Sequence, residues 1–189
     1  MMKKIVPAVF VLAVLGLLGG GFFYWWNSQA DVRELNKTLP AGVQVAKSLY
    51  GNEYKVVNKI DGYEFKVPKE WRGVREASYS PVITEQGYAA SSFGIEGNDA
   101  AGRFTGIDRY KIENDNTSLK FWAETNFNTF GLVGDFSEDK VGEFDIVKTE
   151  ESVHLGGMFV YFFKNNNAIY AIVNGSEDFI RYIITNGKW

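Results

Sequence analysis

The chain has 189 residues, 16% of them aromatic, and a formal net charge of −3 with acidic and basic residues interspersed. It contains no cysteine, which excludes disulfides, thiolate catalysis, cysteine-bound zinc, iron–sulfur clusters and lipid attachment through an N-terminal cysteine. No basic stripe follows any predicted element, so nucleic-acid binding has no support. The aromatic content favours a folded, sheet-rich body over a disordered tether.

The first predicted element is an apolar helix. An uncharged run of 22 residues begins at Ile5 and ends at Trp26, just after two lysines. A helix of that length spans about 33 Å, close to the hydrocarbon thickness of about 30 Å. Tyr24 and two tryptophans close the run, where an interfacial aromatic belt is expected. We therefore expect residues 1–30 to anchor a single-pass membrane protein, with a cytoplasmic N-terminus and an extracytoplasmic domain, periplasmic or at the cell surface.

A cleaved signal peptide is the alternative for this segment. Ser28 and Ala30 are small residues at the two positions that a signal peptidase reads. Against cleavage, the apolar run is longer than the usual stretch of about 7–15 residues. The run also ends in bulky aromatic side chains. The sequence favours the anchor and leaves cleavage open.

Residues 31–42 are expected to form a linker or short stalk helix, and residues 43–189 a globular domain. The domain opens with strand patterns at residues 43–49 and 53–57, which flank a Gly51-Asn52 turn and predict a hairpin. In residues 63–67, apolar and charged side chains alternate, which predicts a strand with one buried face. The further strand candidates are residues 75–80, 88–95, 103–112 and 143–153.

A hairpin with apolar side chains on both faces is predicted near the C-terminus. Its strands, residues 158–163 and 168–173, are apolar at odd and even positions alike. A strand that is apolar on both sides must be covered on both sides, so we expect this hairpin at the centre of the sheet. The side chains expected to be buried there are Val160, Phe162, Tyr170 and Ile172.

Two helices complete the domain. One is predicted over residues 118–130, with Asn116 or Thr117 as its cap. Its apolar face consists of Leu119, Trp122, Ala123, Phe127 and Phe130. The closing helix, residues 177–185, follows an N-cap at Ser176. These elements predict an α+β fold, a mostly antiparallel β-sheet flanked by helices, preceded by one N-terminal transmembrane helix.

Residues 63–71 resemble the opening of PsbP-type domains, since an aromatic strand is followed by Pro68 and Trp71. Those domains are related in fold to Mog-type Ran-binding proteins and to bacterial DcrB-like lipoproteins. The order of elements over residues 54–189 is also similar to that fold. The resemblance implies an α/β/α sandwich that works as a binding or assembly module, without an active site shared across the family. Photosystem attachment and Ran binding do not transfer, because no residue here matches either activity.

No catalytic site is predicted. His154 is the only histidine, and Ser152 precedes it by two residues, but neither a nucleophile elbow nor an orienting acid accompanies them. We interpret His154 as a sheet-end or turn residue. Glu150 and Glu151 point to opposite faces of a regular strand, so they form a poor acid/base pair for glycoside chemistry.

Carboxylates crowd the segment between Asp135 and Asp145, and such groups suit hard cations such as calcium. The acidic residues are Asp135, Glu138, Asp139, Glu143 and Asp145. Their spacing does not match an EF-hand loop, and Lys140 opposes cation binding. We interpret the segment as a solvated loop, with a cation site as the alternative. No metal or cofactor set is predicted elsewhere.

Other conspicuous residues have structural interpretations. The glycines within residues 94–97 and 131–134 lack a phosphate-binding fingerprint, so we interpret them as turn or cap glycines. Trp71 and Trp189 are expected to pack at a strand end and at the C-terminus. The alternative is that these two tryptophans are exposed interaction aromatics.

The sequence favours a membrane-anchored extracytoplasmic binding or accessory module, which acts by protein–protein contact with an envelope complex and is not an enzyme. A small-ligand or cation-binding domain is the alternative, and a hydrolase centred on His154 and Ser152 is the third hypothesis. A flat exposed aromatic patch would favour the binding module. An apolar cavity under Trp122 and Phe127 would favour the ligand-binding domain, and a pocket converging on His154 would favour the hydrolase.

We predict that the substitution His154→Ala leaves biological activity intact, because this histidine has no partner at a catalytic spacing. The measurement is a complementation or partner-binding assay, with folding of the variant checked by circular dichroism. Loss of activity in a well-folded His154→Ala variant would place a hydrolase or metal site first.

Overall fold

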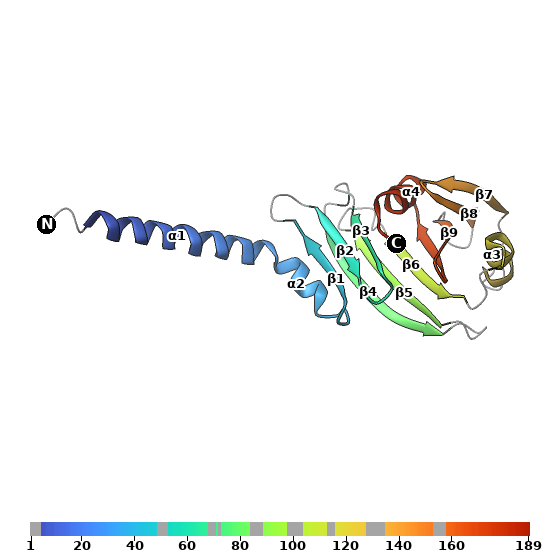
Figure 1. Cartoon of the computed structure of the whole chain (residues 1–189), viewed down its shortest axis with the longest axis horizontal. Coiled ribbons are helices and arrows are strands. Elements are labelled where there is room, and N and C mark those ends of the chain that lie inside the picture. Colours follow the sequence, from blue (N-terminus) through green and yellow to red (C-terminus); the bar gives the residue numbers. More distant parts are fainter. Residues whose placement is uncertain are drawn as a thin grey trace.

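A computed structural model describes residues 5–48, 53–67, 71, 73–83, 89–97, 104–112, 116–127, 135–152 and 158–189 of the chain. This part contains two antiparallel sheets and four helices (Figure 1). The predicted α+β fold, with a mostly antiparallel sheet and helices packed against it, is confirmed at this level.

The elements have the following bounds. The helices are α1 (Ile5–Ser28), α2 (Ala30–Asn36), α3 (Leu119–Phe127) and α4 (Glu177–Asn186). The small sheet has the order β1-β2-β3, from β1 (Val43–Lys47), β2 (Tyr54–Asn58) and β3 (Tyr63–Val67). The large sheet has the order β4-β5-β6-β10-β9-β8-β7, from β4 (Val74–Ile83), β5 (Ala89–Gly97), β6 (Phe104–Lys111), β7 (Phe136–Val141), β8 (Phe144–Ser152), β9 (Met158–Asn165) and β10 (Ala168–Asn174).

The large sheet is the middle of three layers (Figure 1). Its inner face packs against the small sheet and α4, and its outer face packs against α3, which lies over β7, β8 and β9. The small sheet and α4 share one layer, because the N–H groups of Glu64 and Lys188 each donate to the other residue's carbonyl at 2.8 Å. The domain therefore has a larger apolar core between the sheets and a smaller one under α3.

The hairpin β9–β10 lies at the centre of the large sheet, as predicted. Val160, Phe162 and Ile172 have 0% of their surface exposed, and Tyr170 has 4%. Val160 and Phe162 belong to the smaller core, whereas Tyr170 and Ile172 belong to the larger one. The argument that two apolar faces need two covering layers is confirmed.

The predicted helices and the first hairpin are confirmed within the described residues. The expected cap of α3 at Asn116 or Thr117 is wrong, because the Oγ of Ser118 accepts from the N–H of Phe121 at 3.4 Å. β1 and β2 pair antiparallel, although their Gly51-Asn52 turn lies outside the described part. The Oγ of Ser176 accepts a hydrogen bond from the N–H of Phe179 at 3.4 Å, which caps α4. Trp122 and Ala123 on α3 are buried, while Phe130 lies outside the described residues.

The acidic segment that we interpreted as a solvated loop is instead strand β7 followed by a turn at Gly142. The edge position of β7 explains the error. Its two apolar residues, Phe136 and Val141, stand at its ends and face opposite cores, so no apolar alternation marks the strand. Charged side chains between them suit an edge strand, because they discourage pairing with another chain.

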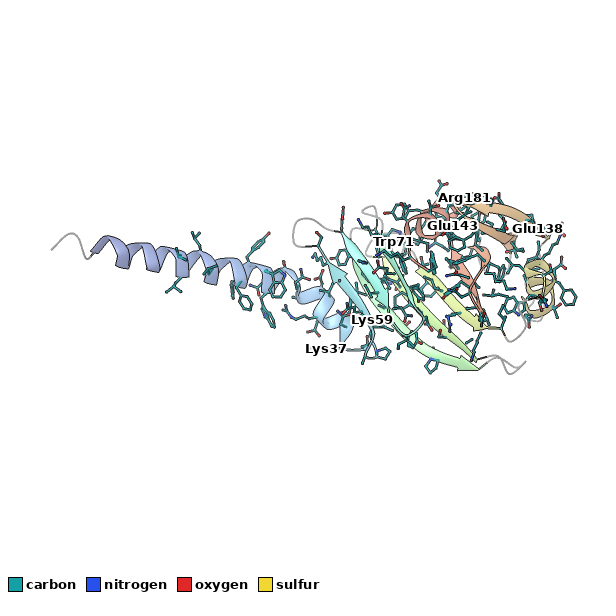
Figure 2. All side chains as sticks on the ribbon, viewed as in Figure 1. Lys37, Lys59, Trp71, Glu138, Glu143 and Arg181 are labelled. Atoms are coloured by element: carbon teal, nitrogen blue, oxygen red, sulfur yellow. The ribbon has the colours of Figure 1, made fainter. Side chains whose placement is uncertain are left out.

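Trp71 packs in the core, as predicted. Its side chain is 1% exposed and lies beside α4, with its ring centroid 4.7 Å from that of Phe179 (Figure 2). Gly97 faces this ring, and a Cβ there would lie 2.8 Å from it. Gly94 and Gly97 both lie within β5, so their interpretation as turn or cap glycines is wrong. A Cβ at Gly94 would likewise lie 2.8 Å from the Phe104 ring, so both positions need glycine for steric reasons.

Residues 31–42 were expected to be a linker or short stalk helix. Most of α2 lies here, and it packs on β1 and β4. Val32 is 4% exposed and Leu39 is 9% exposed, and both belong to the larger core. The packed unit therefore begins before residue 43.

Within the described residues, no helix is both long and apolar enough to cross a membrane. The described residues therefore give no support for the transmembrane span expected in residues 1–30, which stays a prediction.

We predict that Phe162→Ala lowers the free energy of unfolding by about 3–5 kcal/mol, because the ring is fully buried in the smaller core. Chemical denaturation measures the effect. Phe121→Ala is the matched control, since Phe121 is 63% exposed on α3 and should change stability by less than about 0.5 kcal/mol. Equal stability of the two variants would contradict the central burial of β9.

Candidate functional site

The helix α1 extends away from the globular body (Figure 1). The described side chains of its second half are largely apolar and exposed. More than half of the surface is exposed in Leu15, Leu17, Leu18, Phe22, Phe23 and Tyr24. Apolar patches of this kind mark contacts with a protein or a membrane, since soluble monomers rarely expose them. The α1 surface is therefore the most unusual feature of the described part of the chain.

Aromatic rings gather at the C-terminal end of α1. The ring of Phe22 lies 5.7 Å from that of Trp25 and 6.1 Å from that of Trp26, between centroids. The guanidinium of Arg33 lies 4.0 Å from the centroid of Trp26 and also donates a hydrogen bond to the Trp26 carbonyl. A helix end leaves such carbonyls without partners, so Arg33 completes the end of α1 from the next helix.

The helix α2 is fastened to the edge of the small sheet by one amide side chain. The Nδ2 of Asn36 donates to the carbonyl of Val45 at 2.8 Å, and its Oδ1 accepts from the Val45 N–H at 2.8 Å. Val45 lies in β1, an edge strand of that sheet. Asn36 thus satisfies backbone groups that an edge strand would otherwise leave open.

A charged triad joins the start of α2 to two strands. The carboxylate of Asp31 accepts hydrogen bonds from the Nζ of Lys47 at 3.0 Å and from the hydroxyl of Tyr54. Burial alone would raise the pKa of Asp31, but the hydrogen bonds from Tyr54 and Lys47 outweigh it and lower the pKa. With Asn36, this triad holds the segment that follows α1 firmly against the domain.

A second ionic network fixes the start of α4. The Oε1 of Glu177 accepts from the Nζ of Lys148 at 3.0 Å, from the Nε of Arg181 at 3.1 Å and from the hydroxyl of Tyr161. These hydrogen bonds lower the pKa of Glu177 to about 2, and the bond from Tyr161 has the largest effect. Arg181 also pairs with Asp139 of β7. Figure 2 shows Arg181 on the same side of the body as Glu143.

A third polar cluster lies between the two sheets. Asp61, in the turn between β2 and β3, accepts from the Nδ2 of Asn58 at 2.8 Å and lies 3.9 Å from the guanidinium of Arg109. Its backbone carbonyl accepts from the Tyr170 hydroxyl at 3.1 Å. Tyr63 is also buried here, and burial raises its pKa well above the ordinary value. The cluster closes the β2–β3 turn onto the large sheet.

A hollow of about 520 Å³ lies beside the end of α4. Its lining includes Glu143, Phe144, Asn165, Thr185, Lys188 and Trp189. The ring of Trp189 packs 4.9 Å from that of Phe163 and 5.3 Å from those of Tyr63 and Tyr170, between centroids. The predicted packing of Trp189 is confirmed, and its partly buried ring also forms a wall of the hollow.

The residues considered for catalysis are only partly described. His154 and the segment 131–134 lie outside the described residues. Glu150, Glu151 and Ser152 end β8, and the pairing with β9 shifts register between Thr149 and Ser152. The regular strand on which the opposite-face argument for Glu150 and Glu151 depends is therefore interrupted.

The carboxylates of the acidic segment are dispersed along a strand and a turn. Asp139 pairs with Arg181, and Asp145 lies 3.8 Å from the Nζ of Lys140. In the described part of the chain, no group of three or more His, Cys, Asp or Glu side chains is placed to hold a metal ion.

Sequence reasoning missed the residues that lock α2 and α4 in place. The spacing of Glu177 and Arg181, four residues apart in one helix, is a signal that could have predicted their ion pair. By contrast, Asp31 meets Lys47 and Tyr54 across 16 and 23 residues of sequence, and no local pattern indicates that contact.

Comparisons with protein-family models, with curated proteins and with solved structures found no match to this chain. The class of protein therefore has to be argued from the residues and geometry described above.

We predict that stability falls as the pH drops from about 4.5 towards about 2, and that Glu177→Gln makes this fall shallower. The sign follows from the lowered pKa of Glu177, since its stabilisation is present above the unfolded value and lost on protonation of the folded state. Urea denaturation at stepped pH measures the slope. Asp178→Asn, in the same first turn, is the matched control for the loss of one carboxylate. An unchanged slope in Glu177→Gln would contradict the network.

Proposed function

We propose that the chain is a membrane-anchored extracytoplasmic binding or accessory module, which holds its domain at a membrane and acts by contact with an envelope protein complex. The observation that carries this proposal is the exposed apolar surface of α1, which extends away from the body (Figure 1). The globular body supplies the binding surface, and α1 supplies the attachment.

The composition of the N-terminal segment supports insertion into lipid. The run from Ile5 to Trp26 has no charge, and its last residues are aromatic. Trp and Tyr favour the headgroup level, where an amphipathic ring meets both lipid and water. Arg33 stacks on Trp26 at this level and keeps its charge outside the apolar run. Two lysines before the run favour a cytoplasmic N-terminus.

A PsbP-like α/β/α sandwich is the proposed fold relationship. The order of strands, helix α3, further strands and closing helix α4 supports it. The buried Trp71 after β3 also supports it, because this residue belongs to the motif that carries the resemblance. A three-stranded sheet shares the layer of α4, so the sandwich here has one mixed outer layer.

The outer face of β4, β5 and β6 is the proposed contact surface for the envelope partner. α3 covers the other end of that face, over β7, β8 and β9 (Figure 1). Small side chains such as Ser78, Ser80 and Ser92 make the surface flat, and the ring of Phe104 lies on it, 42% exposed. A flat surface with one exposed aromatic ring suits a protein contact, since aromatic residues are enriched in interfaces.

Binding of a small ligand is the second candidate function. The hollow beside α4 supports it, since its volume of about 520 Å³ falls in the range of about 300–1,000 Å³ typical of ligand sites. Lys188 and Glu143 would supply its charged contacts. Neither proposal assigns the chain an enzymatic step, and we infer that it acts by binding.

We predict that the full chain stays with the membrane fraction at alkaline pH, and that Leu17→Lys/Leu18→Lys releases it, because two charges in the apolar surface oppose insertion. A chain beginning at Gln29, which keeps α2, should be soluble. The matched control is Phe121→Lys/Tyr182→Lys, at exposed apolar positions of the body, and it should stay bound. Release of the unsubstituted chain would contradict the anchor.

The envelope partner is tested by affinity capture of the intact protein from detergent-solubilised membranes. Phe104→Asp should lose a partner that the unsubstituted chain retains, whereas Phe121→Asp on α3 should keep it. Capture of the same proteins by all three chains would contradict the proposed contact surface.

A further inference from the structure

A groove on the outer face of the small sheet is lined mainly by lysines. Its volume is about 250 Å³, and its charged lining consists of Lys47, Lys55, Lys66 and Glu53. Lys55 and Lys66 lie on this outer face, whereas Lys47 follows the inward face with Tyr54 and pairs with Asp31 at 3.0 Å. The remaining lining residues are Ala46, Ser48 and Tyr54.

Two of these lysines stand directly opposite each other. Lys55 of β2 pairs in register with Lys66 of β3, and Ala46 of β1 pairs with Lys55 on its other side. Like charges at directly opposed positions destabilise a sheet, because their Cβ atoms are only about 5 Å apart. The small side chain of Ala46 leaves space beside them, and this space is the groove.

The carboxylates nearby leave this pair incompletely neutralised. Glu64 accepts from both Lys55 and Lys188, at 2.6 Å each, so one carboxylate serves two cations. Lys66 lies 4.0 Å from Glu53, and both side chains are exposed, at 60% and 40%. An exposed pair at that distance contributes little, so the Lys66 ammonium can turn to another anion.

The groove lies at the end of the domain nearest α1. Lys47 and Tyr54, which line it, contact Asp31 at the start of α2. Asp31 follows Trp26 by five residues across the junction of α1 and α2, so it lies at most about 8 Å further along the axis of α1. The headgroup layer on each side of a bilayer is roughly 5–8 Å thick. Figure 1 shows the ends of β1 and β2 beside the end of α1.

We infer that this groove binds the phosphate of an anionic phospholipid headgroup, between Lys55 and Lys66. The inference rests on the proposed anchoring by α1, which places the groove at headgroup level. An anion in the groove relieves the repulsion between the two opposed lysines and sets the rotation of the domain on the membrane.

The test uses the full chain in lipid nanodiscs of phosphatidylcholine, with or without an equal amount of phosphatidylglycerol. Labelling by an amine-reactive reagent is followed for each lysine by peptide mass spectrometry. Anionic lipid should slow the labelling of Lys55 and Lys66 by about five-fold each. High salt should remove the difference.

Two lysines outside the groove serve as internal controls. Lys120 on α3 lies at the far end of the body and should not respond to the lipid. Lys37 on α2 lies near the anchor but outside the groove (Figure 2), so it reports the general surface potential. Equal protection of Lys37 and Lys66 would overturn the inference, because the potential alone would then explain the effect.

A variant separates the groove from its surroundings. In Lys66→Gln, the lipid-dependent protection of Lys55 should disappear, because the opposed lysine that completes the site is lost. Lys120→Gln/Lys140→Gln removes two lysines that also have carboxylate partners, and it should keep the protection. Circular dichroism checks folding, and the unsubstituted chain still supplies the labelling test if the variant unfolds.

The remaining outcomes distinguish this inference from the proposed function. Incorporation into both kinds of nanodisc without any lipid-dependent protection would overturn the headgroup site and leave the anchor intact. Failure to enter either nanodisc would overturn the anchor itself. Protection by inorganic phosphate in neutral nanodiscs, without a response to phosphatidylglycerol, would overturn the choice of a lipid headgroup.

Discussion

The requirement that both faces of the β9–β10 hairpin be covered determines the rest of the architecture. Phe163 and Tyr170 face the small sheet and α4, whereas Phe162 and Val160 face the core beneath α3. Leaving either set in water would forfeit a large part of the apolar burial that stabilises a domain of this size. The small sheet and α4 on one side, and α3 on the other, are therefore as necessary as the hairpin itself.

Ionic and amide contacts fix the position of α2 on the domain that the apolar core stabilises. Asn36 satisfies an edge strand, and Asp31 joins α2 to β1 and β2. As a result the chain leaves α1 and enters the packed domain within a few residues, without a flexible segment between them. If α1 lies in a membrane, as proposed, the same face of the domain stays turned towards it. Partner contact on the outer face of β4–β6 and lipid contact at the lysine groove are then compatible, because they use different surfaces.

The charge distribution is consistent with attachment to a surface. Although the chain has a net charge of −3, Lys55 and Lys66 stand directly opposite each other in one groove near α1. Acidic residues instead occupy the edge strand β7 and the first turn of α4. Net charge alone conceals this asymmetry, which becomes visible only when β2 and β3 are paired in register.

The elements that could be predicted from the sequence are those whose pattern is local. Apolar residues on both faces predicted the central hairpin, alternation predicted β3, and the cap at Ser176 predicted α4, because periodicity and capping act within a few residues. β7 was missed because an edge strand needs few apolar side chains. The division into two sheets, the burial of α2, the contacts of Asp31 and the pairing of Lys55 with Lys66 in register could not be predicted from the sequence. These features depend on which strands become neighbours, and strand order depends on the packing of the whole core rather than on the sequence of any one segment.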